Sequence, residues 1–397
     1  MEKKKLSIRG YIFILFFIFV LIHYFLIGIK LAPSEFVEFD SVAYHIPIAK
    51  SILSGEFIKP HFDSFFKYFP GASEGILALF ILSKTPLGLY NWFAVICLFF
   101  VSYFLFTKFN GNKNLAVIFA FSLCTLNSVL RWISNQTVDI WLAVYFIGAI
   151  TLLVRPKDET GYYLKLGFFS GMLIGTKYSG LMFLPALLFI YRANFIRNLN
   201  FIRFVIFTIP LTIFGFFWYI RNYFATGNPF YPMDSFLFKG VPTYPGYFVW
   251  QSIIQKPMSV FNALISEYMI WGFLILLPVL FLFKSFKKIK MKDEISKLIL
   301  LGIFNFIIFL LLPSTVFYQT HVSVFRYAFV VFIPLILSVF LLAESIKSEK
   351  IIIITAFTSF LMIISPKYHP KLLFLILPIA LYLFARKELV NIKKMFS

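Results

Sequence analysis

The sequence is poor in charged residues, in acidic residues and in cysteine. Only 14% of its 397 residues are charged, whereas 60% are hydrophobic and the mean hydropathy is +0.87. About a quarter of the residues of an ordinary soluble domain are charged and about half are apolar. The composition therefore excludes that class and predicts an integral membrane protein. The two cysteines, Cys97 and Cys124, both fall inside apolar runs, so the chain carries no disulfide framework.

Long apolar runs recur along the whole chain. No small-residue cleavage site follows the first run, which is long enough to span a bilayer, so we interpret it as an anchor helix. Other runs are shorter than the roughly 20 residues of a perpendicular span, and we expect about 11–13 transmembrane helices. The predicted fold is an all-α polytopic membrane protein, with residues 1–397 forming a single transmembrane domain. The runs lie near residues 11–29, 87–107, 115–130, 138–154, 164–176, 179–191, 201–220, 268–283, 297–313, 327–343, 351–365 and 372–385.

The scarcity of acid leaves a formal charge of +20, from 37 lysines and arginines against 17 acidic residues. If the runs cross in alternation and the N-terminal basic cluster lies inside, 24 of the 37 basic residues fall on that side. Basic residues concentrate in the cytoplasmic segments of membrane proteins. The charge thus indicates membrane orientation and argues against binding of nucleic acid. We expect a multi-pass protein of the inner (plasma) membrane with both termini in the cytoplasm.

Two long segments, 30–86 and 221–267, are then expected to be extracytoplasmic loops. The first holds six of the 17 acidic residues. Within it, the patterns of residues 41–54 and 74–84 predict short helices in the membrane interface, where Pro47 is tolerated only at a kink or an early turn. The remaining connections are short, so no soluble appendage is expected.

The first candidate site lies at the start of the first loop. Glu38 and Asp40 form an acidic cluster near the membrane surface, with Tyr44 one helical turn after Asp40 and His45 next to that tyrosine. A carboxylate here could take a proton from an acceptor hydroxyl as a general base, and Glu38 could share the task. A solvated loop acid is the simpler alternative.

Asp139 and Lys177 are the next candidates. Asp139 opens a helix after a tight outer turn, where the helix dipole favours an acid, and it could also face a cavity beside Asp40. Lys177 is a cation between two apolar runs, suited either to snorkelling or to binding a phosphate. A divalent ion held by Asp40, Asp139 and water would also fit.

Two arginines, Arg221 and Arg326, are expected at the outer ends of helices, and Asn222 follows the first of them. Each arginine could be an interfacial anchor, but a guanidinium also binds a lipid phosphate through two parallel hydrogen bonds. Further along, Gly227-Asn228-Pro229 predicts a turn, because glycine permits a positive φ and proline fixes the next one.

Taken in order, these motifs resemble a GT-C-fold glycosyltransferase. The resemblance is to bacterial relatives of protein O-mannosyltransferases and aminoarabinose transferases, the dolichyl-phosphate-mannose-mannosyltransferase type, and covers about residues 10–330. The chain departs from better-known members in having the single acid Asp40 where they often have two adjacent ones. The motifs are Glu38-Phe39-Asp40, Asp40-x-x-x-Tyr44-His45-x-Pro47, Tyr68-Phe69-Pro70-Gly71, Asp139, Gly175-Thr176-Lys177-Tyr178, and Arg221-Asn222 followed by Gly227-Asn228-Pro229.

The resemblance implies transfer of a sugar, with inversion, from a polyprenyl-phosphate donor to a lipid, polysaccharide or protein of the cell envelope on the extracytoplasmic face. Asp40 and Asp139 would be catalytic, and membrane lipids would be partners. The implied substrate- or phosphate-binding residues are Glu38, Tyr44, His45, Lys177, Arg221, Asn222 and Arg326.

Three alternatives remain open. The main one is a polytopic transporter or flippase of lipid-linked or small polar substrates, which predicts internal repeats and charges near the bilayer midplane. The others are a non-catalytic lipid-binding protein and a polysaccharide polymerase or ligase with a diphosphate-linked donor.

Overall fold

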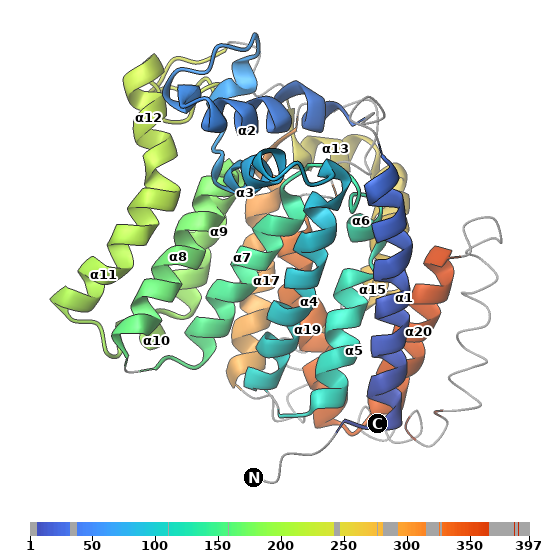
Figure 1. Ribbon diagram of the computed structural model, residues 1–397. Coiled ribbons are helices and arrows are strands. Elements are labelled where there is room, and N and C mark those ends of the chain that lie inside the picture. The colour runs from blue at the N-terminus through green and yellow to red at the C-terminus, as the bar shows by residue number, and fades with distance from the viewer. Residues whose placement is uncertain are drawn as a thin grey trace.

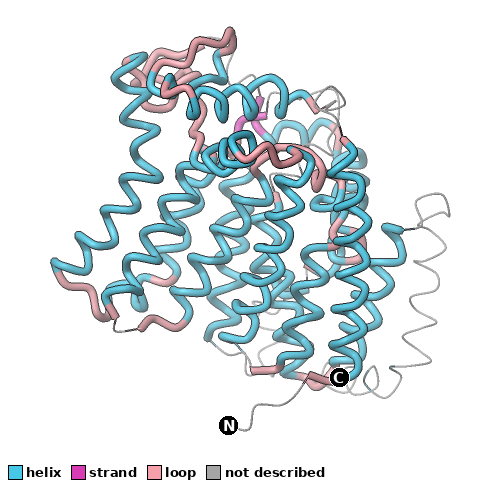
Figure 2. The backbone as a smooth tube through the Cα atoms, in the orientation of Figure 1, coloured by secondary structure: helices cyan, strands magenta, loops and turns pink. Residues whose placement is uncertain are grey.

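Figure 1 shows the computed structural model of the protein, an almost wholly helical molecule. In the described part of the chain the exception is one antiparallel pair of two-residue strands, β1 (Tyr247–Phe248) and β2 (Pro313–Ser314), seen in magenta in Figure 2. The structure describes residues 6–31, 38–109, 111–157, 159–241, 247–275, 277–280, 293–314, 325, 328–364, 385 and 388.

The longer helices run side by side and form an upright bundle (Figure 1). Their apolar residues build one large core. The members of the bundle are α1 (Ile8–Lys30), α4 (Tyr90–Phe109), α5 (Lys113–Cys124), α7 (Asp139–Val154), α8 (Thr160–Thr176), α9 (Tyr178–Ile190), α11 (Phe201–Leu211) continued by η6 (Thr212–Phe216) and α12 (Phe217–Thr226), α17 (Asp293–Leu310), α19 (Phe329–Ser345) and α20 (Glu349–Ile364).

Short helices lie across one end of this bundle, which we call the capped end (Figure 1). The expected interfacial helices are confirmed as helices: residues 41–54 form η2 (Ser41–His45) and α2 (Ile46–Leu53), and residues 74–84 fall largely in α3 (Ala72–Leu82). Of the remaining short helices, α10 (Arg192–Ile196) lies at the opposite end of the bundle and α15 (Trp271–Leu274) lies beside the long helices (Figure 1). The others are η3 (Glu56–Ile58), η4 (Phe65–Tyr68), η5 (Leu87–Leu89), α6 (Asn127–Leu130), α13 (Val249–Gln255), α14 (Pro257–Tyr268) and α16 (Leu277–Leu280).

Three helical runs are long and apolar enough to cross a membrane: Ile8–Lys30, Leu87–Phe109 and Phe201–Thr226. The chain is therefore a helical protein with the character of a membrane protein. Most other expected spans are helices of 12 to 18 residues, such as α7 and α17. The expected span 268–283 is described only in part, by α15 and α16, and the span 372–385 lies outside the described residues except for Ala385. The number of crossings stays a prediction.

Twelve basic residues of the described part lie in or beside the connections at the end of the bundle opposite the capped end, and others, such as Lys177 and Arg221, belong to the capped end. At this opposite end α1, α5, α8, α11, α17 and α20 begin, and α4, α7, α9 and α19 end (Figure 1). Residues 1–5 and 281–292, which add to the expected basic side, lie outside the described part. The basic residues in or beside the described connections are Arg9, Lys108, Lys113, Arg155, Lys157, Lys165, Arg192, Arg197, Arg203, Lys297, Lys347 and Lys350.

Helix α8 packs directly on the backbone of α11 and η6. Three glycines four residues apart share one face of α8, and a Cβ added at any of them would meet a backbone carbonyl oxygen of the neighbouring helix. Small residues let two helices approach without intervening side chains, so this face of α8 fixes where the α11–α12 helix lies. The glycines are Gly167, Gly171 and Gly175, and the oxygens belong to Phe207, Pro210 and Phe214.

Pro47 follows a turn of π-helix. In a regular α-helix the proline ring would clash with the carbonyl four residues earlier. Here η2 widens the helix over Ser41–His45, and the N–H of Ile46 donates to the oxygen of Ser41, five residues back. Pro47 therefore sits in the first turn of α2, as the sequence predicted. The predicted turn after α12 is also present, because Gly227 caps that helix with φ +75°.

Candidate functional site

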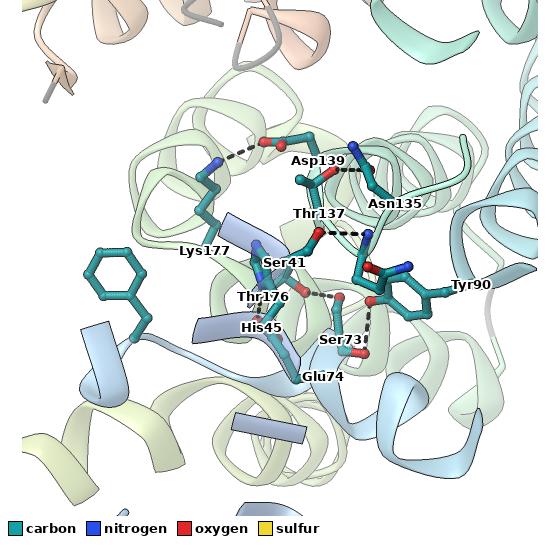
Figure 3. A network of polar contacts seen from close by, with 12 residues as sticks. Ser41, His45, Ser73, Glu74, Tyr90, Asn135, Thr137, Asp139, Thr176 and Lys177 are labelled. Atoms are coloured by element: carbon teal, nitrogen blue, oxygen red, sulfur yellow. Dashed lines mark hydrogen bonds and ion pairs between the residues drawn. The ribbon is translucent and has the colours of Figure 1, made fainter. Parts of the chain in front are cut away.

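Four contacts at the capped end join segments that are far apart in the sequence (Figure 3). They link η2 to α3, α3 to the end of α8, the start of α9 to the start of α7, and the loop before α7 to η2. The four contacts therefore form a closed circuit of segments. We call this set the polar ring. Its contacts are His45 Nδ1 with Glu74 Oε1 at 2.7 Å, Ser73 Oγ with Thr176 Oγ1 at 2.7 Å, Lys177 Nζ with Asp139 Oδ1 at 2.7 Å, and Gln136 N with Ser41 Oγ at 3.1 Å.

Glu38 caps the helix that begins at the next residue. Its Oε1 accepts the backbone N–H of Asp40 at 3.1 Å, and its Oε2 accepts the backbone N–H and the hydroxyl of Ser41 at 2.7 and 2.8 Å. Carboxylates suit this position, because the first N–H groups of a helix have no partner within it. The structure thus gives Glu38 a helix-capping role beside half-buried Asp40. Its expected contact with substrate stays a prediction.

Lys177 and Asp139 form an ion pair between two helix starts. Lys177 has an extended backbone that ends α8 and begins α9, and Asp139 is the first residue of α7. The side chain of Lys177 is 24% exposed and that of Asp139 is 7% exposed. The sequence identified both residues but did not predict that they pair with each other. The pair leaves the ammonium group the more accessible of the two.

Arg221 is almost enclosed, with 4% exposure. Its guanidinium donates to Oδ1 of Asn222 at 2.7 and 3.0 Å and to the backbone oxygens of Phe57 and Phe69 at 3.2 Å, and it lies 4.9 Å from the Trp218 ring. These contacts fasten α12 to the first loop. A phosphate could reach Arg221 only by replacing some of them, so the expected role of Arg221 in phosphate binding stays a prediction.

Asn222 extends the same contact set to α9. Its Nδ2 donates to the oxygen of Tyr68 and to the hydroxyl of Tyr178, both at 2.8 Å, and that hydroxyl donates to the oxygen of Tyr231 at 2.6 Å. Asn222 is fully buried. The expected outer-loop motif therefore joins the first loop, α9 and the second loop into one support for the polar ring.

Tyr44 and His45 are adjacent and their ring centroids lie 4.2 Å apart, but their other partners differ. Tyr44 is buried, and its ring centroid lies 5.0 Å from that of Phe66 and 5.3 Å from that of Phe69. His45 instead pairs with Glu74. The sequence does not distinguish Glu74 as a site residue, because its only signal there is an acid in the first turn of an apolar helix. Tyr44 is thus placed by aromatic packing.

The remaining sequence expectations concern Arg326 and a metal ion. Arg326 lies outside the described residues. Across the described ranges no three His, Cys, Asp or Glu side chains are grouped so that they could hold a metal ion. The ion suggested for Asp40 and Asp139 therefore has no additional protein ligand of these types in that part of the chain.

A second buried acid lies behind the loop that precedes α7. Glu267 is fully buried; its Oε1 lies 3.1 Å from the guanidinium of Arg131, and Asn127 donates to the neighbouring oxygen of Ser266 at 3.0 Å. Burial raises the pKa of Glu267 to about 7, although Arg131 opposes the shift. The pair anchors the start of this loop to α14.

Glu267 is expected to make stability depend on pH. The unfolded chain releases this proton near pH 4.5 and the folded chain near pH 7. The free energy of unfolding therefore falls by about 3 kcal/mol as pH rises through that window, and this carboxyl changes it no further at higher pH. Glu267→Gln, whose side chain does not titrate, is expected to remove this slope. Thermal unfolding in detergent from pH 4.5 to 8 measures it, and an unchanged slope in the variant would contradict the assignment.

Comparisons with known proteins give no match. No protein-family model matches the chain, and no curated protein or solved structure matches it.

Proposed function

We propose that the protein is a membrane glycosyltransferase, which moves a sugar from a polyprenyl-phosphate donor to an acceptor hydroxyl at the capped end. The observation that supports this most is the polar ring. It gathers a carboxylate–lysine pair, a carboxylate–histidine pair and hydroxyl groups at one end of an otherwise apolar bundle. A lipid-linked phosphate and a polar acceptor need such a place, because their polar groups meet at the membrane surface while the lipid tail stays in the bilayer.

The chemistry assigns a role to each group. The acceptor oxygen attacks the anomeric carbon, the bond from that carbon to the phosphate oxygen breaks, and the phosphate leaves with the electron pair. Displacement from the face opposite the phosphate inverts the anomeric centre. Lys177 stabilises the charge that grows on the phosphate, and Asp40 deprotonates the acceptor hydroxyl or orients it.

The short connections opposite the capped end support an orientation in the membrane. They carry twelve described basic residues, and short basic segments of membrane proteins tend to stay in the cytoplasm. We therefore place the polar ring on the extracytoplasmic face of the inner (plasma) membrane. Donor and acceptor would both reach it from that side.

Asp40→Asn tests the role of Asp40. In membranes supplied with tritiated undecaprenyl-phosphate sugars, we expect the variant to bind donor as wild type does and to transfer about 10²-fold more slowly, because the acceptor hydroxyl loses the carboxylate that deprotonates or orients it. Asp63→Asn, a change at an exposed acid of the same loop, is the matched control and should retain full activity. Undiminished transfer by Asp40→Asn would overturn the role of Asp40, and a wild-type protein that binds no donor would overturn the function.

A further inference from the structure

The buried pair of His45 and Glu74 has the form of a base with its orienting acid. His45 is 3% exposed and Glu74 is 1% exposed, and Nδ1 lies 2.7 Å from Oε1. A neutral imidazole that donates from Nδ1 keeps a lone pair on Nε2. Within the described residues Nε2 forms no hydrogen bond, so no described side chain competes for that lone pair.

A π-helical turn separates Asp40 from His45. In an α-helix Asp40 and Tyr44, four residues apart, would share a face. A π-helix instead bonds residues five apart, and here η2 follows Asp40 directly and ends at His45. Tyr44 packs in the aromatic cluster with Phe66 and Phe69, and its ring centroid lies 4.2 Å from that of His45. Asp40 and the His45–Glu74 pair thus lie about one π-helical turn apart in a continuous helical segment.

We propose that His45 Nε2 is the group that receives the proton of the acceptor hydroxyl, with Glu74 as its positioning residue. This deepens the proposed glycosyl transfer and rests on it. Asp40 then orients the acceptor through a hydrogen bond. As the acceptor oxygen bonds to the anomeric carbon, its proton passes to Nε2, and the electron pair of the broken bond leaves with the phosphate. Glu74 stabilises the resulting imidazolium through Nδ1.

Several other charged or titratable groups surround the pair. Glu74 acts electrostatically on groups of α4, α7 and α12, and η2 itself contributes an acid and a phenol. A pH profile of the wild type alone therefore does not identify the base, and the variants must do so. The groups are Asp40 and Tyr44 on η2, Tyr90 on α4, Tyr145 on α7 and Arg221 on α12.

The test compares His45→Gln with wild type in the full-length protein in nanodiscs. Tritiated undecaprenyl-phosphate hexoses and pentoses serve as donor, and membranes of the expressing cells supply acceptor. We expect kcat to fall about 100-fold, the donor Kd to stay within twofold, and the acidic limb of the rate–pH profile to disappear. His61→Gln, at an exposed histidine of the same loop, should match wild type.

Glu74→Gln, measured in the same assay, tests the second residue of the pair. It should lower kcat about tenfold and displace the acidic limb, and Glu74→Asp should recover part of the loss, which a merely structural role would not produce. A His45→Gln protein that keeps the wild-type rate or the wild-type acidic limb overturns the inference and leaves glycosyl transfer intact. If wild type binds no donor, the proposed function fails instead. If His45→Gln lowers the thermal midpoint, its loss of activity could come from misfolding, and the rate–pH profile of Glu74→Gln becomes the deciding measurement. An acidic limb at the same pH as in wild type would then overturn the role of the pair.

Discussion

Lys177→Met is expected to lower sugar transfer about 10³-fold, because it removes the most accessible cation of the polar ring from the departing phosphate. The ammonium group lies 2.7 Å from Asp139, whose side chain is only 7% exposed. Methionine has a similar length but carries no charge, so it also removes the ion pair between that carboxylate and Lys177. Loss of one partner from a largely buried pair costs about 3–5 kcal/mol, and we expect the thermal midpoint in detergent to fall together with the rate.

The double variant Lys177→Met with Asp139→Asn separates stability from catalysis. Removing both charges eliminates the buried carboxylate that has lost its ion pair with Lys177, so the thermal midpoint should return close to that of wild type. Transfer should remain about 10³-fold below wild type, because the phosphate still lacks its cation. Recovery of transfer in the double variant would show that Lys177 only neutralises Asp139. Lys177→Arg keeps the charge, so its transfer rate should lie between those of wild type and Lys177→Met.

Gly175→Ala is expected to destabilise the protein by about 4 kcal/mol, among the largest effects of a single substitution. The added methyl group would meet the backbone oxygen of Phe214 on η6. A backbone oxygen cannot move away by a change of rotamer, as a side-chain atom can, so α8 and the α11–α12 helix must separate. Because Gly175 precedes Thr176 and Lys177, the displacement also reaches the polar ring. Thermal unfolding in detergent and the transfer assay should both show the loss.

Gly161→Ala is the matched control. Gly161 lies in the same helix, but a Cβ there has no neighbour within 4 Å. Alanine restricts the unfolded chain and favours helix, so this variant should be as stable as wild type or more stable by about 0.5 kcal/mol. Equal losses at both positions would mean that contact with η6 does not decide the stability of α8.

Apolar periodicity and turn chemistry predicted most of the helices. The runs at 138–154 and 179–191 became α7 and α9 with boundaries shifted by about one residue, because Asp139 and Lys177 mark the starts of those helices. Gly227 was also located correctly, since a positive φ is a local property of the chain. The region 268–283 gave the least agreement. Met269, with φ +52°, separates α14 from α15 there, and no local signal announces it.

The partners within the site could not be predicted, because each contact joins distant segments. Asp139 and Lys177 were both singled out, yet their pairing depends on how α7 packs beside α9. Glu74 was passed over because an acid in the first turn of a helix already has a local explanation. The π-turn could not be predicted either, because the α-helical spacing of Asp40 and Tyr44 gives no local signal for the wider turn over Ser41–His45.

The polar ring also sets the order in which the protein can become complete. Its contacts join residues 29, 38, 95 and 103 positions apart. A growing chain makes the His45–Glu74 contact first, and it cannot close the ring until Lys177 has emerged and α4, α5, α7 and α8 have found their places. A nascent chain arrested before that residue would carry every acid of the first loop but not Lys177. Closure of the ring therefore marks the moment in biosynthesis at which a partly inserted chain gains the lysine on which we expect its activity to depend.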